Sequence, residues 1–256
     1  MKRTGNILGF LFFFVLCPPA FAQSAIAFDS ISDNVIFRKE WSGGVTFHSG
    51  GWGVTFHKGQ YLDVERKRMW EADLVGMKTG KEVKSVIPYF SDARPFVYGK
   101  LNYLYILRAG YSFHNLLNRK PYWGGVELRY FYSAGISVGI TRPVYLYIWY
   151  VDDTIGNYFT IKVKSEKYNP NKHDLGNIYG RGPYGDGFDQ LEFHPGIYLK
   201  AGLNFDFGTF NRFVKCLEVG GILDYYPQAI QLMAFNPSKN LFPSIYLSFS
   251  LGKRGN

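Results

Sequence analysis

The chain has 256 residues and a formal net charge of +9, and aromatic residues make up 19 % of it. Its basic residues are scattered rather than gathered in one stripe, which argues against a nucleic-acid-binding protein and fits attraction to anionic lipid headgroups. The abundance of Tyr, Phe, Gly and Val favours β structure, and two cysteines exclude a disulfide-rich scaffold.

The chain begins with the features of an export signal. Lys2 and Arg3 precede an apolar run, and the small-x-small sequence Ala20-Phe21-Ala22 follows it. The apolar run is shorter than the roughly 20 residues that a spanning helix needs, so a retained membrane anchor is the weaker alternative. We predict that residues 1–22 are a signal peptide removed on export and that residues 23–34 are a periplasmic lead-in.

A short repeat follows the lead-in. The sequence GVTFH occurs at residues 44–48 and again at 53–57, on either side of Ser-Gly-Gly-Trp. Two alternating segments around a glycine pair predict a β-hairpin. His48 and His57 occupy equivalent positions of the repeat, which raises the possibility of a metal pair. Histidine at the polar end of a strand is the simpler interpretation, and we assign no metal and no cofactor.

The pattern is less regular between residues 60 and 94. Trp70, Ala72 and Leu74 alternate with Glu71 and Asp73. We interpret this as a continuation of the second hairpin strand, which is either long or bulged near Gly59, with a loop over 78–93. An extra hairpin in this region is the alternative.

The clearest pattern is a period-two alternation over residues 126–141, far longer than the five or six residues of an ordinary soluble strand. Successive side chains of a strand point to opposite sides, so this segment presents an apolar face to one medium and a small, polar face to another. The apolar face consists of Val126, Leu128, Tyr130, Tyr132, Ala134, Ile136, Val138 and Ile140. Residues 97–112, 195–207, 217–226 and 243–251 repeat the design.

Long strands with one apolar face and one polar face predict a β-sheet that lies in a membrane. A soluble β-sandwich also alternates, but here large apolar residues oppose Gly, Ser, Asn and charged residues, as lipid and a wet interior require. An open edge would leave backbone groups unpaired in hydrocarbon, so the sheet must close. We predict an all-β chain that forms a transmembrane antiparallel up-and-down β-barrel in the cell outer membrane over residues 35–256. The count is eight strands, or ten if 60–94 adds a hairpin.

The remaining segments predict the loops and the orientation. The aromatic residues Tyr145, Tyr147, Trp149 and Tyr150 indicate a fifth strand that ends at a membrane interface. Residues 152–194 are rich in Gly, Pro, Asn and Asp, which favours a long loop with a short strand at 158–163. With both termini periplasmic, this loop lies outside the cell, and short turns at Arg142 and Gly208 lie inside.

The interior of an eight-stranded barrel is narrow enough for side chains to fill it. Charged residues on the polar faces are therefore expected to form a network of ion pairs in the lumen, which disfavours a wide pore. The predicted network consists of Lys100, Arg108, Glu127, Arg129, Lys200, Asp206, Glu218 and Asp224.

Four further segments stand out, and they are residues 38–44 (RKEWSGG), 98–102 (YGKLN), 124–132 (GGVELRYFY) and 177–181 (NIYGR). These segments resemble an uncharacterised family of outer-membrane barrels from Bacteroidota-type bacteria. The resemblance covers most of the mature chain and brings no established activity or catalytic residue with it. By analogy of fold, such barrels look like accessory subunits of secretion or barrel-assembly machines.

The sequence offers little chemistry. Ser112 and His114 lie on one strand face, a spacing that suits the nucleophile and base of a lipid A hydrolase, but no orienting carboxylate accompanies them. We predict a non-enzymatic structural or accessory subunit whose partners are outer-membrane lipid, lipopolysaccharide and other outer-membrane proteins. A narrow channel for small solutes and the hydrolase remain as alternatives.

Overall fold

The computed structural model describes residues 39–255, with gaps at 89, 91, 121–124, 156–157 and 209–212. The predicted signal peptide and lead-in therefore lie outside the described residues. Within the described part of the chain, no helix is long and apolar enough to cross a membrane.

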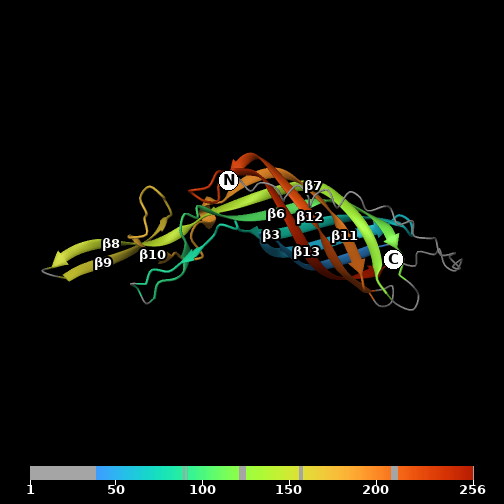
Figure 1. The fold of residues 1–256 in the computed structure, drawn as a ribbon, viewed down its shortest axis with the longest axis horizontal. Helices are drawn as coiled ribbons and strands as arrows, with labels where there is room; N and C mark the ends of the chain where they lie inside the picture. The colour runs from blue at the N-terminus through green and yellow to red at the C-terminus, as the bar shows by residue number, and fades with distance from the viewer. Residues whose placement is uncertain are drawn as a thin grey trace, which may run out of the picture. The chain divides into compact units, whose positions relative to one another are not determined.

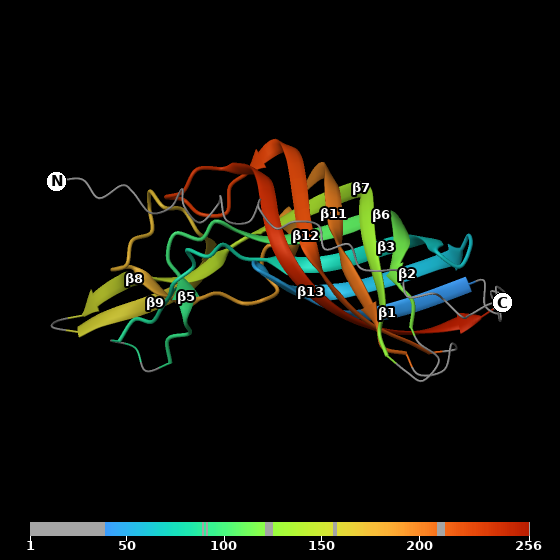
Figure 2. The same cartoon turned by 45° about the vertical axis from the view of Figure 1, so that its right-hand side comes forward.

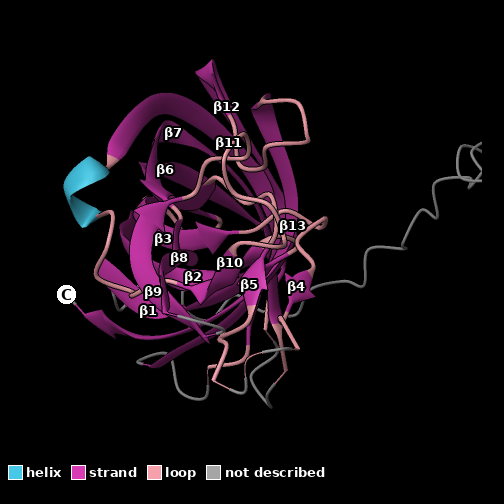
Figure 3. Cartoon of the chain, turned by 90° about the vertical axis from the view of Figure 1, so that its left-hand side faces the viewer, coloured by secondary structure: helices cyan, strands magenta, loops and turns pink. Residues whose placement is uncertain are grey.

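Eight long strands form a closed antiparallel barrel (Figure 3). Each barrel strand pairs with the next one along the chain, and the last pairs with the first. The strands are β1 (Lys39–His48), β2 (Gly51–Tyr61), β3 (Arg66–Met77), β6 (Asn102–Asn118), β7 (Glu127–Pro143), β11 (Glu192–Asp206), β12 (Phe213–Ile230) and β13 (Lys239–Gly255). The predicted eight-stranded up-and-down barrel is confirmed, and the ten-stranded alternative is wrong.

The third barrel strand, β3, was not expected as a separate strand. The predicted bulge near Gly59 is wrong, because β2 pairs with β3 in unbroken register. A turn separates the two strands, and Asp63 stabilises it by accepting hydrogen bonds from the backbone N–H groups of Glu65 and Arg66 at 3.0 and 2.6 Å. The alternation at Trp70 thus belongs to a separate barrel strand.

The aromatic segment expected as the fifth barrel strand lies outside the barrel. It forms β8 (Tyr145–Ile155), which pairs with β9 (Tyr158–Lys167) and β10 (Ile178–Arg181) in a separate three-stranded sheet. This sheet extends beyond one end of the barrel (Figures 1 and 2). Arg142 is therefore not in a turn on the inner side, because β7 ends at this same end of the barrel.

The two ends of the barrel differ in the length of their connections. One end carries the two long segments 78–101 and 144–191 and the shorter connections 49–50 and 231–238. The long segments include the short strands β4 (Lys84–Ser85) and β5 (Phe96–Val97) and the 3-10 helix η1 (Phe188–Gln190). The other end carries only connections of eight residues or fewer, 62–65, 119–126 and 207–212, together with both ends of the barrel domain. Long loops outside and short turns inside are the rule for outer-membrane barrels, so we call these ends extracellular and periplasmic.

The two faces of each strand meet different media. Outward side chains are large and apolar, and many stay exposed in the isolated chain, as Ile245 at 74 % and Ile136 at 63 % show. Inward side chains on the same strands are buried and mostly polar, such as Ser248 and Ser250 at 1 % exposure. An apolar belt around a polar interior is the arrangement of a protein that spans the outer membrane, where the chain resides.

Two glycines allow a tyrosine to cross the lumen. Gly110 of β6 and Gly135 of β7 pair directly, and the ring of Tyr198 lies over both. A Cβ at Gly135 would come within 2.3 Å of the carbonyl oxygen of Ala109 and 2.8 Å of the Tyr198 ring. The close approach of strand and ring therefore requires glycine.

We expect Gly135→Ala to lower the free energy of unfolding by about 1–3 kcal/mol, because the added methyl group overpacks this contact. Urea unfolding of the barrel in lipid vesicles measures the change. Gly221→Ala is the matched control, since a Cβ at Gly221 meets nothing within 4 Å. Equal stability of the two variants would contradict the prediction.

Candidate functional site

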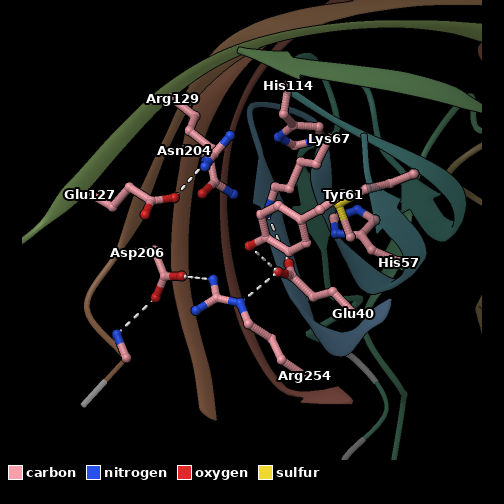
Figure 4. A network of polar contacts seen from close by, with 12 residues as sticks. Glu40, His57, Tyr61, Lys67, His114, Glu127, Arg129, Asn204, Asp206 and Arg254 are labelled. Atoms are coloured by element: carbon pink, nitrogen blue, oxygen red, sulfur yellow. Dashed lines mark hydrogen bonds and ion pairs between the residues drawn. The ribbon is translucent and has the colours of Figure 1, made fainter. Parts of the chain in front are cut away.

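The periplasmic end of the lumen is closed by a charged cluster on the first and last strands (Figure 4). Glu40 of β1 accepts hydrogen bonds from Lys67 at 2.9 Å, from Arg254 at 2.9 Å and from the Tyr61 hydroxyl at 2.8 Å. The guanidinium of Arg254 also pairs with Asp206. These contacts tie β1, β2, β3, β11 and β13 together across the lumen.

Arg129 closes the same end from the opposite wall. Its guanidinium donates to the carbonyl oxygens of Val64 and Glu65 at 3.1 and 2.8 Å, and its Nε pairs with Glu127. The Arg129 side chain therefore holds the β2–β3 turn in place. The sequence alone did not reveal this turn. Figure 4 shows Arg129 and Glu127 beside the Arg254 cluster.

A single cation organises the middle of the lumen. The Nζ of Lys200 lies 3.5 Å from Glu71, 3.6 Å from Asp73 and 3.8 Å from Glu218, and all four side chains are 2 % exposed. The rings of Tyr246 and Phe131 flank the ammonium at 4.8 and 5.7 Å. A buried charge requires such compensation, because desolvation disfavours it strongly.

Neutral donors satisfy the same three carboxylates. Tyr198 and Ser133 both donate to Glu71 at 2.6 Å. The other donors are Thr55 to Asp73 at 2.5 Å and Asn204 to Glu218 at 2.9 Å. The polar interior is therefore a connected network, held by side chains from five strands.

The lumen becomes apolar toward the extracellular end. Arg108 and Asp224 form a two-pronged ion pair at 2.8 Å, with exposures of 1 % and 0 %. Beyond it, inward apolar side chains pack into one cluster, which we call the apolar plug. The plug consists of Val75, Met77, Leu104, Ile106, Tyr226, Ile230, Leu232, Met233 and Phe242.

The structure places seven of the eight predicted network residues on inward positions of barrel strands, in the contacts above. Lys100 differs from this expectation. It lies in the loop before β6, where its Nζ donates to Glu82 at 2.7 Å and lies over the Tyr103 ring. Burial lowers the pKa of Lys100, and the hydrogen bond to Glu82 opposes that shift. Strand alternation predicts Lys100 at an inward position of a barrel strand. In the structure it is buried instead by the loop that folds over the barrel mouth.

Sequence reasoning missed five charged members of the network: Glu40, Lys67, Glu71, Asp73 and Arg254. The alternation of Glu71 and Asp73 against Trp70 was visible, but residues 66–77 had not been assigned to a separate strand. Arg254 lay beyond the expected end of the last strand at 251. A longer β13 brings it opposite Glu40.

Ser112 and His114 do lie together, with 3.2 Å between Oγ and Nε2. Both face the lumen, with exposures of 1 % and 2 %, and His114 stacks on Phe131. The other ring nitrogen of His114 has no hydrogen-bond partner among the described residues, so no carboxylate orients the ring. A lipid substrate would lie on the opposite side of the wall, which disfavours the hydrolase.

The repeat histidines do not meet. His48 pairs with Gly51 at the turn, whereas His57 pairs with Ser42 deep in the lumen. Among the described residues, no group of three or more His, Cys, Asp or Glu side chains has the arrangement of a metal site.

The extracellular sheet is anchored by its own core. Side chains from β5, β8, β10 and the residues that follow β7 and β9 pack together as Phe96, Val144, Leu146, Ile148, Tyr168 and Ile178. Burial raises the pKa of Tyr168 to about 12, with a further contribution from Tyr98. The sheet order β10-β8-β9 leaves β9 as an edge strand of this three-stranded sheet. The structure therefore presents a folded projection rather than an irregular loop.

We expect Lys200→Met to destabilise the barrel by about 3–5 kcal/mol, because three buried carboxylates lose their shared cation. Lys215→Met is the control, since Lys215 is an exposed residue of β12 and its loss should change stability by at most about 0.5 kcal/mol. Urea titration in lipid vesicles compares the two. A similar midpoint for both variants would show that Lys200 does not organise the lumen.

We expect the native barrel to give no steady single-channel current in planar lipid bilayers, because ion pairs and the apolar plug fill its lumen. Replacing Leu104 and Ile106 by glycine should leave it closed, since the Arg108–Asp224 pair lies beneath. A stable unitary conductance of the native protein would instead favour the channel alternative.

Comparison with solved structures finds bacterial outer-membrane and surface proteins at low similarity. Neisserial surface protein A is 9 % identical, with a TM-score of 0.38 over 85 % of this chain and 96 % of that chain. The attachment invasion locus protein of Yersinia pestis, in complex with the heparin analogue sucrose octasulfate, is 8 % identical, with a TM-score of 0.40 over 85 % and 98 %. A major outer membrane protein from Thermus thermophilus is 10 % identical, with a TM-score of 0.42 over 84 % and 99 %.

No family model matches the sequence, and no curated protein matches it. The assignment of the fold rests on the strand pairing and on the two faces of the barrel, and both describe an integral outer-membrane β-barrel protein.

Proposed function

We propose that this barrel is a non-enzymatic accessory subunit that presents its extracellular sheet to another outer-membrane protein. The observation that carries the proposal is the segment 144–191, which folds into a sheet with β9 at its edge instead of a plain connection. The barrel serves as the membrane anchor for this sheet.

The lumen supports this proposal by leaving little room for transport. Its charges are paired with one another, and its extracellular part is filled by the apolar plug. A filled interior stabilises an eight-stranded barrel but offers no continuous water path. The extracellular end therefore carries the surface available for function.

The edge strand β9 supports a protein partner. An exposed edge presents backbone N–H and C=O groups that can pair with a strand of another protein, and apolar side chains add affinity to such pairing. On β9, Ile161 and Val163 are exposed at 47 % and 41 %. Lys164 and Lys167 lie exposed beside them, which favours an acidic partner strand.

The test is co-purification from gently solubilised outer membranes. We expect the native protein to migrate in a complex larger than the monomer, and Ile161→Asp with Val163→Asp to release the monomer, because the added charges oppose docking on β9. Native gel electrophoresis and mass spectrometry of the excised complex give the readout.

The matched control is Val86→Asp with Leu175→Asp, which changes two apolar loop residues exposed at 54 % and 51 %. This variant should keep the complex. Recovery of the native protein only as a lone monomer would contradict the proposal, and so would equal loss of the complex in both variants.

A further inference from the structure

Two cavities of the barrel meet at its extracellular rim. One is a pocket of about 300 Å³ at the mouth, and the other is a groove of about 960 Å³ on the outer wall. Both volumes lie in the range of small-molecule sites. The two share Ser49, Pro243 and Ser244 as lining residues, so they adjoin beside the short β1–β2 turn.

The mouth pocket combines an apolar floor with a basic rim. Its floor is the outer surface of the apolar plug, which contributes Met77, Ile230, Leu232, Met233 and Phe242. Lys78, Lys81 and Lys239 line the rim and are exposed. Within the described part of the chain, none of these lysines forms an ion pair. Their charge therefore remains available to an anion.

Polar groups beside the lysines add hydrogen-bonding capacity. Lys81 donates to the side-chain oxygen of Asn236 at 3.0 Å, which holds its ammonium group against the 231–238 connection. Thr79 also lines the pocket, and its hydroxyl is buried and has no hydrogen-bond partner among the described residues.

The outer groove runs between two rows of outward side chains that follow the pairing of the strands. The first row is Ile245, Gly221, Ala201, Tyr132 and Phe113, and the second is Pro243, Leu223, Leu199, Ala134 and Tyr111. Small residues at Gly221, Ala201 and Ala134 lower its floor, and a Cβ at Gly221 would meet open space. The groove lies in the apolar belt, where lipid chains surround the protein.

The mouth pocket lies at the membrane depth of a lipid headgroup, and the outer groove lies at the depth of the acyl chains. Phe47 and Trp52 flank the β1–β2 turn and are exposed at 56 % and 64 %, which places the upper edge of the apolar belt at this turn. The rim lysines then lie at the level of the headgroups, and the groove descends from Ser49 into the hydrocarbon. Basic side chains at headgroup level attract anionic lipid heads.

We propose that the barrel binds one phosphorylated, acylated lipid of the outer leaflet, with its anionic head on Lys78, Lys81 and Lys239 and an acyl chain in the outer groove. The head receives hydrogen bonds from the three ammonium groups. The site is independent of the extracellular sheet, so it stands whether or not β9 binds a partner.

The proposal is tested by native mass spectrometry of the full barrel domain in detergent, titrated with dimyristoyl phosphatidic acid or dimyristoyl phosphatidylcholine. The two probes have the same chains and differ in their heads. We expect one phosphatidic acid to be retained in preference to phosphatidylcholine. Replacing the three rim lysines by glutamine should weaken retention about a hundredfold.

Two matched controls separate local from general effects. Lys84→Gln, Arg94→Gln and Lys172→Gln remove the same charge from exposed positions of the extracellular segments and should leave retention unchanged. Ala201→Phe with Gly221→Phe fills the groove and should weaken binding of the chains. Gly43→Phe with Gly76→Phe adds similar bulk at outward positions of β1 and β3 that do not line the groove. Far-UV circular dichroism confirms that each variant is folded.

Several outcomes would overturn the proposal. Equal retention of the two lipids would rule out recognition of an anionic head, and equal behaviour of the two lysine variants would rule out the rim. Complete displacement of the lipid by inorganic phosphate would show a site for a free anion without an acyl chain. Unchanged retention in the groove-filling variant would remove the groove from the site.

Discussion

The structure depends on one constraint, which is that a backbone in hydrocarbon must satisfy all its hydrogen bonds within the protein. The pairing of β13 with β1 meets this constraint by closing the sheet. Closure divides every strand into a face toward lipid and a face toward the lumen. The apolar belt and the polar network are both consequences of that division.

Closure also brings together charges that are far apart in the chain. Glu40 and Arg254 stand near opposite ends of the sequence and pair at 2.9 Å. Lys200 collects carboxylates from β3 and β12 in the same way. An ion pair across a narrow lumen holds the walls in place, and it leaves the interior occupied. The surfaces that remain for recognition are the extracellular sheet, the mouth and the outer wall.

The extracellular end is built differently from the spanning part. The segment after β7 turns from a barrel strand into an independent sheet with its own apolar core. Beneath the mouth, the apolar plug is held by packing of apolar side chains rather than by ion pairs. The mouth pocket therefore has an apolar floor under a basic rim. A protein partner at β9 and a lipid at the rim would occupy different parts of this end.

The sequence by itself determined the fold class and the two faces of the long strands, because alternation is a local property that survives without knowledge of neighbours. It also pointed to seven of the charged residues that line the lumen, since inward polar positions can be read from one strand at a time. Only the tertiary structure decided that residues 66–77 enter the barrel while β8 leaves it, because both segments alternate alike and differ only in the strand they pair with. The partners of Lys200, the loop position of Lys100 and the meeting of the two cavities depend on strand register, which joins residues distant in sequence.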